Sequence, residues 1–467
     1  MAFALAWGLL SAEHAEHSSN AHQAPDAWII GTLPFAVILG AIALLPLIPA
    51  TAGWWHSNLS RFVVSVLCGL ATLTYVWIVL GWDAVGLTLN HALLQEYVPF
   101  IILLFSLYVI SGGIHIGGDV RASPAVNTGW LAFGALIASF IGTTGASMLL
   151  IRPLLNTNRE RKHKVHTVVM FIFLVSNIGG TLLPIGDPPL FLGYLEGVPF
   201  LWTFGLWIPW AFACTLLLAI YFVWDTVIYA KESDAVKIFD RTNVQPLHLK
   251  GSINILWLFG VVLCVALIIP GNVVPLTKFE AFNFLRELAM LGLVALSLIT
   301  TRRSVRESNQ FEYGAILEVA ALFLGIFIAM QVPIEVLKSQ GEGIAKALSE
   351  PWMYFWITGG LSSVLDNAPT YLVFFKLAEA GTPTGAPGAL ELLGGGWIME
   401  NPLIAISLGA VFMGAMTYIG NGPNFMVKAI AEQTGVRMPS FFGYVFRYSI
   451  PVLVPVFILV TLLIIWL

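Results

Sequence analysis

Residues 176–189 read SNIGGTLLPIGDPP and interrupt a long apolar segment. Asp187 is the charged residue of this stretch, with Pro184 before it and Pro188 and Pro189 directly after it. Proline lacks the backbone N–H that a helix uses, and its ring clashes with the preceding turn. The sequence therefore predicts a helix that breaks at a carboxylate.

The composition of the 467-residue chain is typical of a membrane protein. Hydrophobic residues make up 58% of it and charged residues only 10%, and the mean hydropathy is +0.85. A soluble domain contains about a quarter charged residues. Apolar runs long enough to cross a hydrocarbon core of about 30 Å recur along the chain. We therefore expect an all-α polytopic membrane protein, and the net charge of −4 argues against a nucleic-acid partner.

The apolar runs predict ten spanning segments and two interrupted stretches. The spanning segments are 28–48, 62–82, 97–112, 166–187, 200–229, 252–271, 283–301, 311–331, 401–430 and 441–466. The stretches 124–150 and 352–380 contain polar residues, glycine and proline, and are expected to form re-entrant hairpins. Residues 1–27 are expected to be a disordered N-terminus or a leader, and residues 230–251 a cytoplasmic linker.

Lysine and arginine concentrate in the loops on one side of this scheme. The richest loops are 152–164, 231–250 and 302–306, and Arg61 and Arg121 are assigned to the same side. Basic loops stay in the cytoplasm. The expected location is therefore the cell (inner) membrane, with both termini outside the cytoplasm.

The order of the segments repeats along the chain. Residues 28–229 contain three spans, a hairpin and two spans, and residues 252–467 contain the same series. The first series starts outside and the second starts in the cytoplasm. This arrangement predicts an inverted-topology repeat, which many secondary transporters share.

Short motifs support this pairing. IGDPPLFL at 185–192 resembles IGNGPNFM at 419–426, and TTGAS at 143–147 corresponds to LDNAP at 365–369. Glycine and proline interrupt the second motif as they do the first. An unwound turn is tolerated at membrane depth only where protein or a water-filled cavity covers it, and its free carbonyls can coordinate a cation. The hairpin tips are therefore expected to meet the two breaks near the midplane.

The candidate ion-binding residues surround this expected chamber. Asp187, Asp366, Asn367 and Asn421 are the predicted Na⁺ ligands. An ionised aspartate at the bilayer centre costs about 2.5–3.5 kcal/mol on insertion scales, so it indicates function. We expect Thr144 and Asn367 to approach Asp187 and Asn421. The remaining candidate residues for ion or substrate binding are Ser176, Asn177, Thr181, Thr143, Gly186, Asn424, Thr370 and Glu318. Packing between helices is the alternative role for Ser176, Asn177, Thr181, Asn421 and Asn424. For Glu318 the alternative is a structural contact with a hairpin.

Other polar residues receive a structural interpretation. Asp225, near the end of its span, is expected to be an interfacial anchor. His115 and Asp119 belong to a glycine-rich stretch that is expected to form a connecting loop, with a cytoplasmic proton relay as the alternative. No lysine or arginine is expected at the chamber positions, although Lys376 and Lys428 lie close enough in sequence to reach inward.

The order of these motifs resembles the ion transporter superfamily. Its members include NhaD-type sodium/proton antiporters, arsenite efflux carriers, citrate–metal symporters and divalent anion:sodium symporters. The resemblance extends from about residue 28 to the end of the chain. It implies an inverted-repeat carrier with a scaffold domain and a mobile transport domain, often dimeric through the scaffold.

Within the superfamily the motifs match two groups in part. NhaD-like chains carry motifs that resemble PIGD and LDN, and residues 184–187 and 365–367 of this sequence match them. Those chains usually carry Asp-Asn at the first hairpin, where this sequence has two threonines. Dicarboxylate symporters carry a motif that resembles SNIGGT…IGTPPN. Residues 176–181 match its first part, and Asp187 replaces the threonine of its second part.

Coulomb's law favours a transported cation. Two carboxylates facing one chamber repel a di- or tricarboxylate unless cations neutralise them first. The same pair binds Na⁺ when ionised and protons when neutral. Sodium/proton antiport by alternating access is the expected function, and sodium-coupled symport of citrate or another di- or tricarboxylate stays open as the alternative.

An intramembrane aspartyl protease is a remote alternative. Those enzymes resemble GxGD, and Pro184 occupies the first glycine position here. The chain is therefore not expected to be an enzyme. We expect no cofactor, with Na⁺ and H⁺ as transported or coupling ions. The expected partners are small ions, a small organic anion under the symport alternative, the lipid bilayer and a second copy of the chain.

Overall fold

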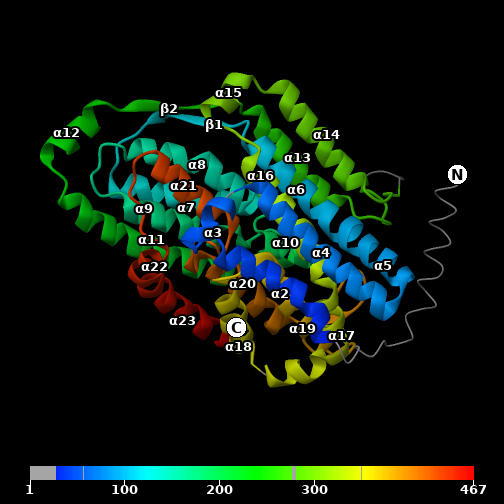
Figure 1. Ribbon diagram of the computed structural model, residues 1–467. Coiled ribbons are helices and arrows are strands. Elements are labelled where there is room, and N and C mark those ends of the chain that lie inside the picture. The colour runs from blue at the N-terminus through cyan, green and yellow to red at the C-terminus, as the bar shows by residue number, and fades with distance from the viewer. Residues whose placement is uncertain (1–27, 56, 276–279, 349, 467) are drawn as a thin grey trace.

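The computed structural model describes residues 28–466 apart from 56, 276–279 and 349. The expected N-terminal leader lies outside the described residues. The described chain is an all-α polytopic membrane protein with two small β-ribbons (Figure 1). Among the described residues, six helical stretches are long and apolar enough to cross a membrane, or seven if the bent pair Ile30–Leu44 and Pro49–Trp55 counts as one span.

The first part of the chain is helical along the expected apolar runs; η marks 3₁₀ and π segments. Its elements are α2 Trp28–Leu44, α3 Pro49–Trp55, α4 Asn58–Leu80, α5 Trp82–Leu89, η2 Asn90–Tyr97, α6 Val98–Ser111, α7 Pro124–Ile141, α8 Thr143–Thr157, α9 Val165–Leu174, η3 Ile178–Thr181, α10 Pro188–Leu195, η4 Trp202–Leu206 and α11 Trp207–Ala230. The expected span 97–112 is the end of a longer stretch, Trp82–Ser111. Polar residues in the η2 segment conceal this continuity in the sequence.

The second part contains the remaining helices. Its elements are α13 Ile253–Leu267, α14 Leu285–Thr300, α15 Arg303–Ser308, α16 Gly314–Ala329, α17 Gln331–Ala347, α18 Pro351–Ser362, α19 Asn367–Ala380, β3 Ala389–Glu391, β4 Trp397–Met399, α20 Glu400–Met413, η5 Gly414–Met416, α21 Gly422–Gln433, α22 Phe441–Tyr444, η6 Val445–Ser449 and α23 Ile450–Trp466. The expected spans 166–187 and 401–430 are each divided by an unwound turn.

The expected connecting loop and linker have regular structure. Strand β1 (His115–Asp119) pairs antiparallel with β2 (Gln245–Lys250), and α12 (Asp234–Thr242) precedes β2. The ladder shifts register next to Gly118, whose φ is +112°, and a Cβ there would lie 2.6 Å from the carbonyl oxygen of Pro246. Glycine thus serves a bulge in a strand, which corrects the expectation of a loop.

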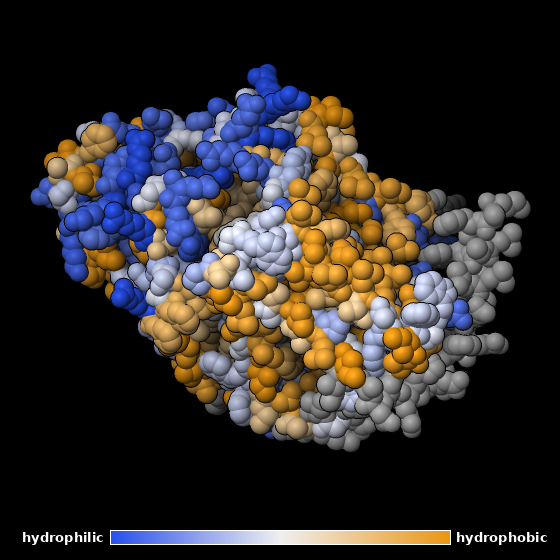
Figure 2. Space-filling model, viewed as in Figure 1, coloured by the Kyte–Doolittle hydropathy of each residue, from blue (hydrophilic) through white to orange (hydrophobic). Residues whose placement is uncertain are grey.

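The exterior is apolar where a bilayer would contact it. Figure 2 shows hydrophobic residues over the flank formed by α2 and α4, and hydrophilic residues gathered at the end that carries α12 and α15. Leu59, Leu67 and Ile78 on α4 are each at least 60% exposed. Such a surface favours lipid over water as its solvent.

Helices from the two parts of the chain pack against each other around the interior. Helix α10 packs against α19, and α21 packs against α8 and α9 (Figure 1). Helix α16 packs along α4 on the other side. The two broken helices therefore meet helices of the opposite part.

Candidate functional site

Two helices break inside the fold, one in each part of the chain. Residues 175–187 separate α9 from α10, and residues 414–421 separate α20 from α21. Asp187 and Asn421 are the N-cap residues of α10 and α21. Proline occupies the first turn of both helices, where its missing N–H has no partner to lose.

The Asp187 carboxylate is the point where the breaks and hairpins meet. Its Oδ1 accepts from Thr143 Oγ1 at 2.8 Å and from Asn421 Nδ2 at 3.0 Å, and its Oδ2 accepts from Asn367 Nδ2 at 2.7 Å. Thr143 begins α8 and Asn367 begins α19. The hairpin tips thus approach the first break as expected, with Thr143 rather than Thr144 bonded to Asp187.

An asparagine network extends this contact into the second break. Asn421 Nδ2 also donates to the Ser176 carbonyl at 3.1 Å and to Asn177 Oδ1 at 3.2 Å. Asn177 Nδ2 donates to Asn424 Oδ1 at 2.7 Å, and the Asn424 amide donates to two carbonyls of the second break. Each amide therefore fixes the path of an unwound backbone segment.

Glycine permits the close approach of these segments. A Cβ on Gly180 would lie 2.6 Å from Thr143 Cγ2, and a Cβ on Gly186 would collide with the Gly180 backbone. In the second break a Cβ on Gly420 would lie 2.7 Å from the Gly414 carbonyl oxygen. A larger residue at these positions would push the hairpin tip or the returning chain away from Asp187.

A cavity of about 310 Å³ opens beside the breaks. Thr144, Asp366, Asn421 and Glu318 line it, together with the ends of α4, α6 and α16. Asp187 lies behind this wall, 1% exposed and bonded to Asn421. The cavity is large enough for water, and the Asn421 side chain both lines it and bonds to the buried Asp187 carboxylate.

A guanidinium group also lines this cavity, at a position that no motif in the sequence indicates. Arg61 on α4 is 5% exposed and pairs with Glu318 on α16 at 2.7 Å. Arg61 Nη1 also donates to Asn58 Oδ1 at 3.0 Å. Arg61 therefore brings a basic residue to the cavity wall, although no lysine or arginine matches the chamber positions in the sequence. The one signal in the sequence is a charged residue near the start of each of two apolar runs.

The remaining candidates mostly satisfy local backbone. Thr181 Oγ1 donates to a carbonyl of its own turn at 2.6 Å, and Thr370 Oγ1 donates to the Asp366 carbonyl at 2.9 Å. Ser176 Oγ lies 2.8 Å from Ser147 Oγ of α8. Ser176 thus joins the first break to the hairpin, whereas the bonds of the two threonines stabilise single turns.

The two lysines considered at the sequence level are held by acids. Lys376 Nζ lies 2.5 Å from Glu196 and 2.9 Å from Glu379. Lys428 Nζ lies 3.0 Å from Glu432 on the same helix. Both side chains therefore point to partners away from the Asp187 carboxylate.

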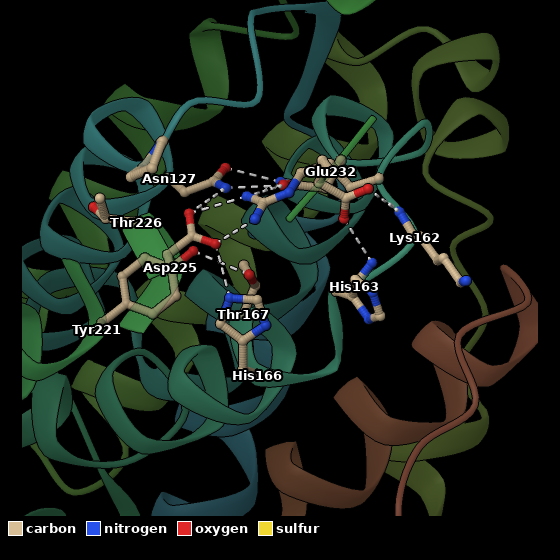
Figure 3. A network of polar contacts seen from close by, with 12 residues as sticks. Asn127, Lys162, His163, His166, Thr167, Tyr221, Asp225, Thr226 and Glu232 are labelled. Atoms are coloured by element: carbon tan, nitrogen blue, oxygen red, sulfur yellow. Dashed lines mark hydrogen bonds and ion pairs between the residues drawn. The ribbon is translucent and has the colours of Figure 1, made fainter. Parts of the chain in front are cut away.

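A second buried carboxylate belongs to a separate network, shown in Figure 3. Asp225 is fully buried and bonds to Arg161 at 2.5 Å and 2.9 Å, to His166 at 2.8 Å and to Asn127 at 3.3 Å. These partners come from α7, α9 and the connection after α8. Asp225 therefore links several helices through buried hydrogen bonds and an ion pair. This corrects its interpretation as an interfacial anchor.

The family model described as "Putative citrate transport" matches residues 23–465, which include both breaks and both hairpin segments. The chain belongs to this family. A comparison with curated proteins returned no match. Membership of the citrate transport family confirms the resemblance to citrate-transporter-like members of the ion transporter superfamily. With the apolar helices, it identifies the chain as a multi-pass membrane protein of the secondary transporter class.

Proposed function

We propose that the protein is a sodium/proton antiporter that works by alternating access, with Asp187 binding Na⁺ and H⁺ in turn. The observation that supports this most is the set of donors on Asp187. A hydroxyl and two amides hold the carboxylate, and all three are neutral. A buried carboxylate without a fixed cation has a strong preference for a bound cation or proton.

The charges around the cavity favour a cation over an anion. The lining contains two acids, Glu318 and Asp366, and Arg61 is already paired with the first of them. Asp187 adds a third carboxylate behind the wall. A citrate-like trianion would meet net negative charge, whereas Na⁺ is attracted.

Oxygen atoms suited to Na⁺ surround the carboxylate. Asn367 is fully buried, and its Oδ1 has no hydrogen-bond partner among the described residues. Its amide nitrogen is bonded to Asp187 at 2.7 Å. Carbonyls of the unwound turns supply further ligands of the kind that Na⁺ prefers in transporters.

We also propose that the two parts of the chain form an inverted repeat with re-entrant hairpins. Ser139 Oγ donates to the Gly179 carbonyl, and Ser363 Oγ donates to the Met413 carbonyl. Each pair joins a hairpin to the broken helix of its own part, four residues before the helix that starts at the hairpin tip. Matching bonds at matching places support two copies of one unit within the chain. We also propose a homodimeric assembly, which the resemblance to the superfamily supports.

Exchange in proteoliposomes tests the antiport proposal. The purified chain is reconstituted with a pH gradient, and Na⁺ is added on one side while an internal dye reports pH. We expect Na⁺ to dissipate the gradient, and K⁺ at the same concentration to have a much smaller effect. A gradient that is insensitive to Na⁺ would contradict the proposal.

Sodium-coupled citrate symport is the second candidate. The family description and Arg61 at the cavity wall favour it. Uptake of labelled citrate driven by Na⁺ in the same liposomes separates the two functions. Under symport, Asp187→Thr would restore the symporter-like IGTPP and retain or improve uptake, whereas antiport predicts that this variant is inactive in both assays.

Cysteine labelling tests the inverted arrangement. An impermeant reagent applied to intact cells should label single cysteines placed in 382–400 and spare those in 152–164 and 231–250. Both termini are expected outside the cytoplasm. Labelling of the 152–164 loop from outside would contradict the inverted repeat.

A further inference from the structure

A second cavity, of about 630 Å³, lies at the other end of the helices that reach Asp187. The first turn of helix α10 lines the cavity beside the breaks, and its last turn lines the second cavity. Asp366, the N-cap residue of α19, lines the cavity beside the breaks, and Lys376 and Glu379 of α19 line the second cavity. The stretch Trp82–Ser111 contributes to both walls. The eight residues of α10 rise about 12 Å, so the two cavities are close but separate.

The wall of the second cavity contains a buried acid with an unused oxygen. Glu96 is 4% exposed and its Oε2 accepts from Gln331 Nε2 at 2.8 Å. Its Oε1 has no hydrogen-bond partner among the described residues, and neither has the buried Nδ1 of His91. These two atoms lie 3.5 Å apart, too far for a good hydrogen bond.

The local backbone sets up this pair. His91 and Glu96 both belong to η2, a π-helical segment inside the long stretch Trp82–Ser111. The wider turns of π-helical segments are frequent at functional sites. The His91 side chain is 44% exposed and that of Glu96 is 5% exposed. An imidazole that contacts both the cavity and a buried carboxyl is placed to pass a proton inward.

We propose that the His91–Glu96 pair is a proton-binding site at the second cavity. In the transfer, an imidazolium at His91 gives its Nδ1 proton to Glu96 Oε1. The products are a neutral imidazole and a carboxylic acid. A hydronium ion in the cavity then gives its proton to His91 and becomes water. Two groups suffice for a proton, whereas no group of three potential metal ligands is found among the described residues.

The charges facing Glu96 come from several helices. Glu196 at the end of α10, Lys376 on α19 and Lys338 on α17 act on it electrostatically. Glu196 and Lys376 are tied to each other at 2.5 Å. The cavity wall also carries Glu379, Arg286 and Glu287, of which the last two form their own pair at 2.6 Å. Protonation of Glu96 would remove its repulsion from Glu196 and its attraction to the two lysines, so the charge of Glu96 is coupled to the ion pair that joins the far ends of α10 and α19.

Infrared difference spectroscopy tests proton binding without any transport. The full chain in lipid nanodiscs is titrated, and the C=O stretch of protonated carboxyls is followed. We expect a band in the wild type that is lost in Glu96→Gln and kept in Glu391→Gln, a matched change at an exposed acid of β3. An unchanged band in Glu96→Gln would overturn the proposal.

The histidine provides a second variant that tolerates substitution better, because its side chain is partly exposed. His91→Gln should shift the pH midpoint of the Glu96 band, and an unshifted midpoint would overturn the relay. A role of the His91–Glu96 pair in Na⁺/H⁺ exchange rests on the proposed antiport function. In liposomes, the Glu96→Gln variant should exchange more slowly than the wild type. Its exchange rate should no longer depend on the pH of the solution on the side of the membrane where the second cavity lies. If the wild type shows no exchange, the infrared result still decides proton binding.

Discussion

Asp187 and Asp225 are both buried, with 1% and 0% of their surfaces exposed, yet their surroundings differ. Asp225 is held by the Arg161 guanidinium and by His166. The hydrogen-bond donors to the Asp187 carboxylate are a threonine hydroxyl and two asparagine amides. A buried charge that keeps a permanent counter-ion is neutralised within the fold. One that keeps only neutral donors retains the capacity to exchange its cation.

The backbone around the two carboxylates differs in the same sense. Asp225 lies within the continuous helix α11, whose own bonds fix its position. Asp187 caps α10 at the end of an unwound segment, and both hairpin tips reach it. A carboxylate at a break can change its neighbours when one segment moves, whereas a carboxylate on a continuous helix moves with that helix. The comparison supports the proposal that Asp187 serves transport, whereas Asp225 holds neighbouring helices together.

The largest expected effect is the loss of exchange in Asp187→Asn. The amide has no charge to bind Na⁺ and no proton to release, so Na⁺-driven dissipation of a pH gradient should disappear. Removing the charge relieves a membrane-insertion cost of about 2.5–3.5 kcal/mol, so expression should hold or improve. Exchange and yield are measured together in the same preparation.

Asp234→Asn is the matched control for this change. The Asp234 side chain on α12 is 93% exposed, so its neutralisation should leave exchange unaltered. Full exchange in Asp187→Asn would remove the distinction between the two buried aspartates.

Asp225→Asn should destabilise the fold instead. It leaves the buried Arg161 without its anionic partner, which costs about 3–5 kcal/mol. The melting temperature in detergent should fall, while exchange per folded molecule stays near the wild-type value. Removing both charges in Arg161→Met/Asp225→Asn should recover part of the loss, because no unpaired charge then remains. If Asp225→Asn alone were as stable as the wild type, the network would contribute little to the stability of the fold.

The broken helix at Asp187 could be predicted from the sequence because its cause is local. Prolines and glycines close to the carboxylate determine where hydrogen bonding stops, and the second motif at 419–426 has the same character. The approach of Asn367 to Asp187 also followed, since an unwound turn at membrane depth needs polar neighbours.

The ion pairs could not be predicted in the same way, because their partners are distant in sequence. Arg61 meets Glu318 across the contact between α4 and α16, and Asp225 meets Arg161 across a helix connection. Nothing in either local sequence fixes such a contact. The placement of Thr143 instead of Thr144 on Asp187 depends on the helical phase of α8 at its first turn, which residue types alone do not set.

Asp187→Glu should have an intermediate effect. The longer side chain keeps the charge but displaces the carboxylate from the Thr143 and Asn367 donors. The concentration of Na⁺ that gives half-maximal exchange should rise more than the maximal rate falls. A Na⁺ titration of the initial rate separates the two parameters. An unchanged half-maximal concentration would show that Na⁺ binding does not depend on this geometry.

The smallest expected effect distinguishes two adjacent threonines. Thr143→Val removes one hydrogen bond to a charged group, worth about 1.5–3 kcal/mol, so Na⁺ affinity should change by about tenfold or more. Thr144→Val alters the cavity wall and leaves the Thr143, Asn367 and Asn421 donors of Asp187 in place, so its effect on Na⁺ affinity should be much smaller. Both variants keep a β-branched side chain at the start of α8, which makes each the control for the other. The same Na⁺ titration measures both. Equal effects would mean that the cavity wall, rather than the donor set of the buried carboxylate, determines Na⁺ binding.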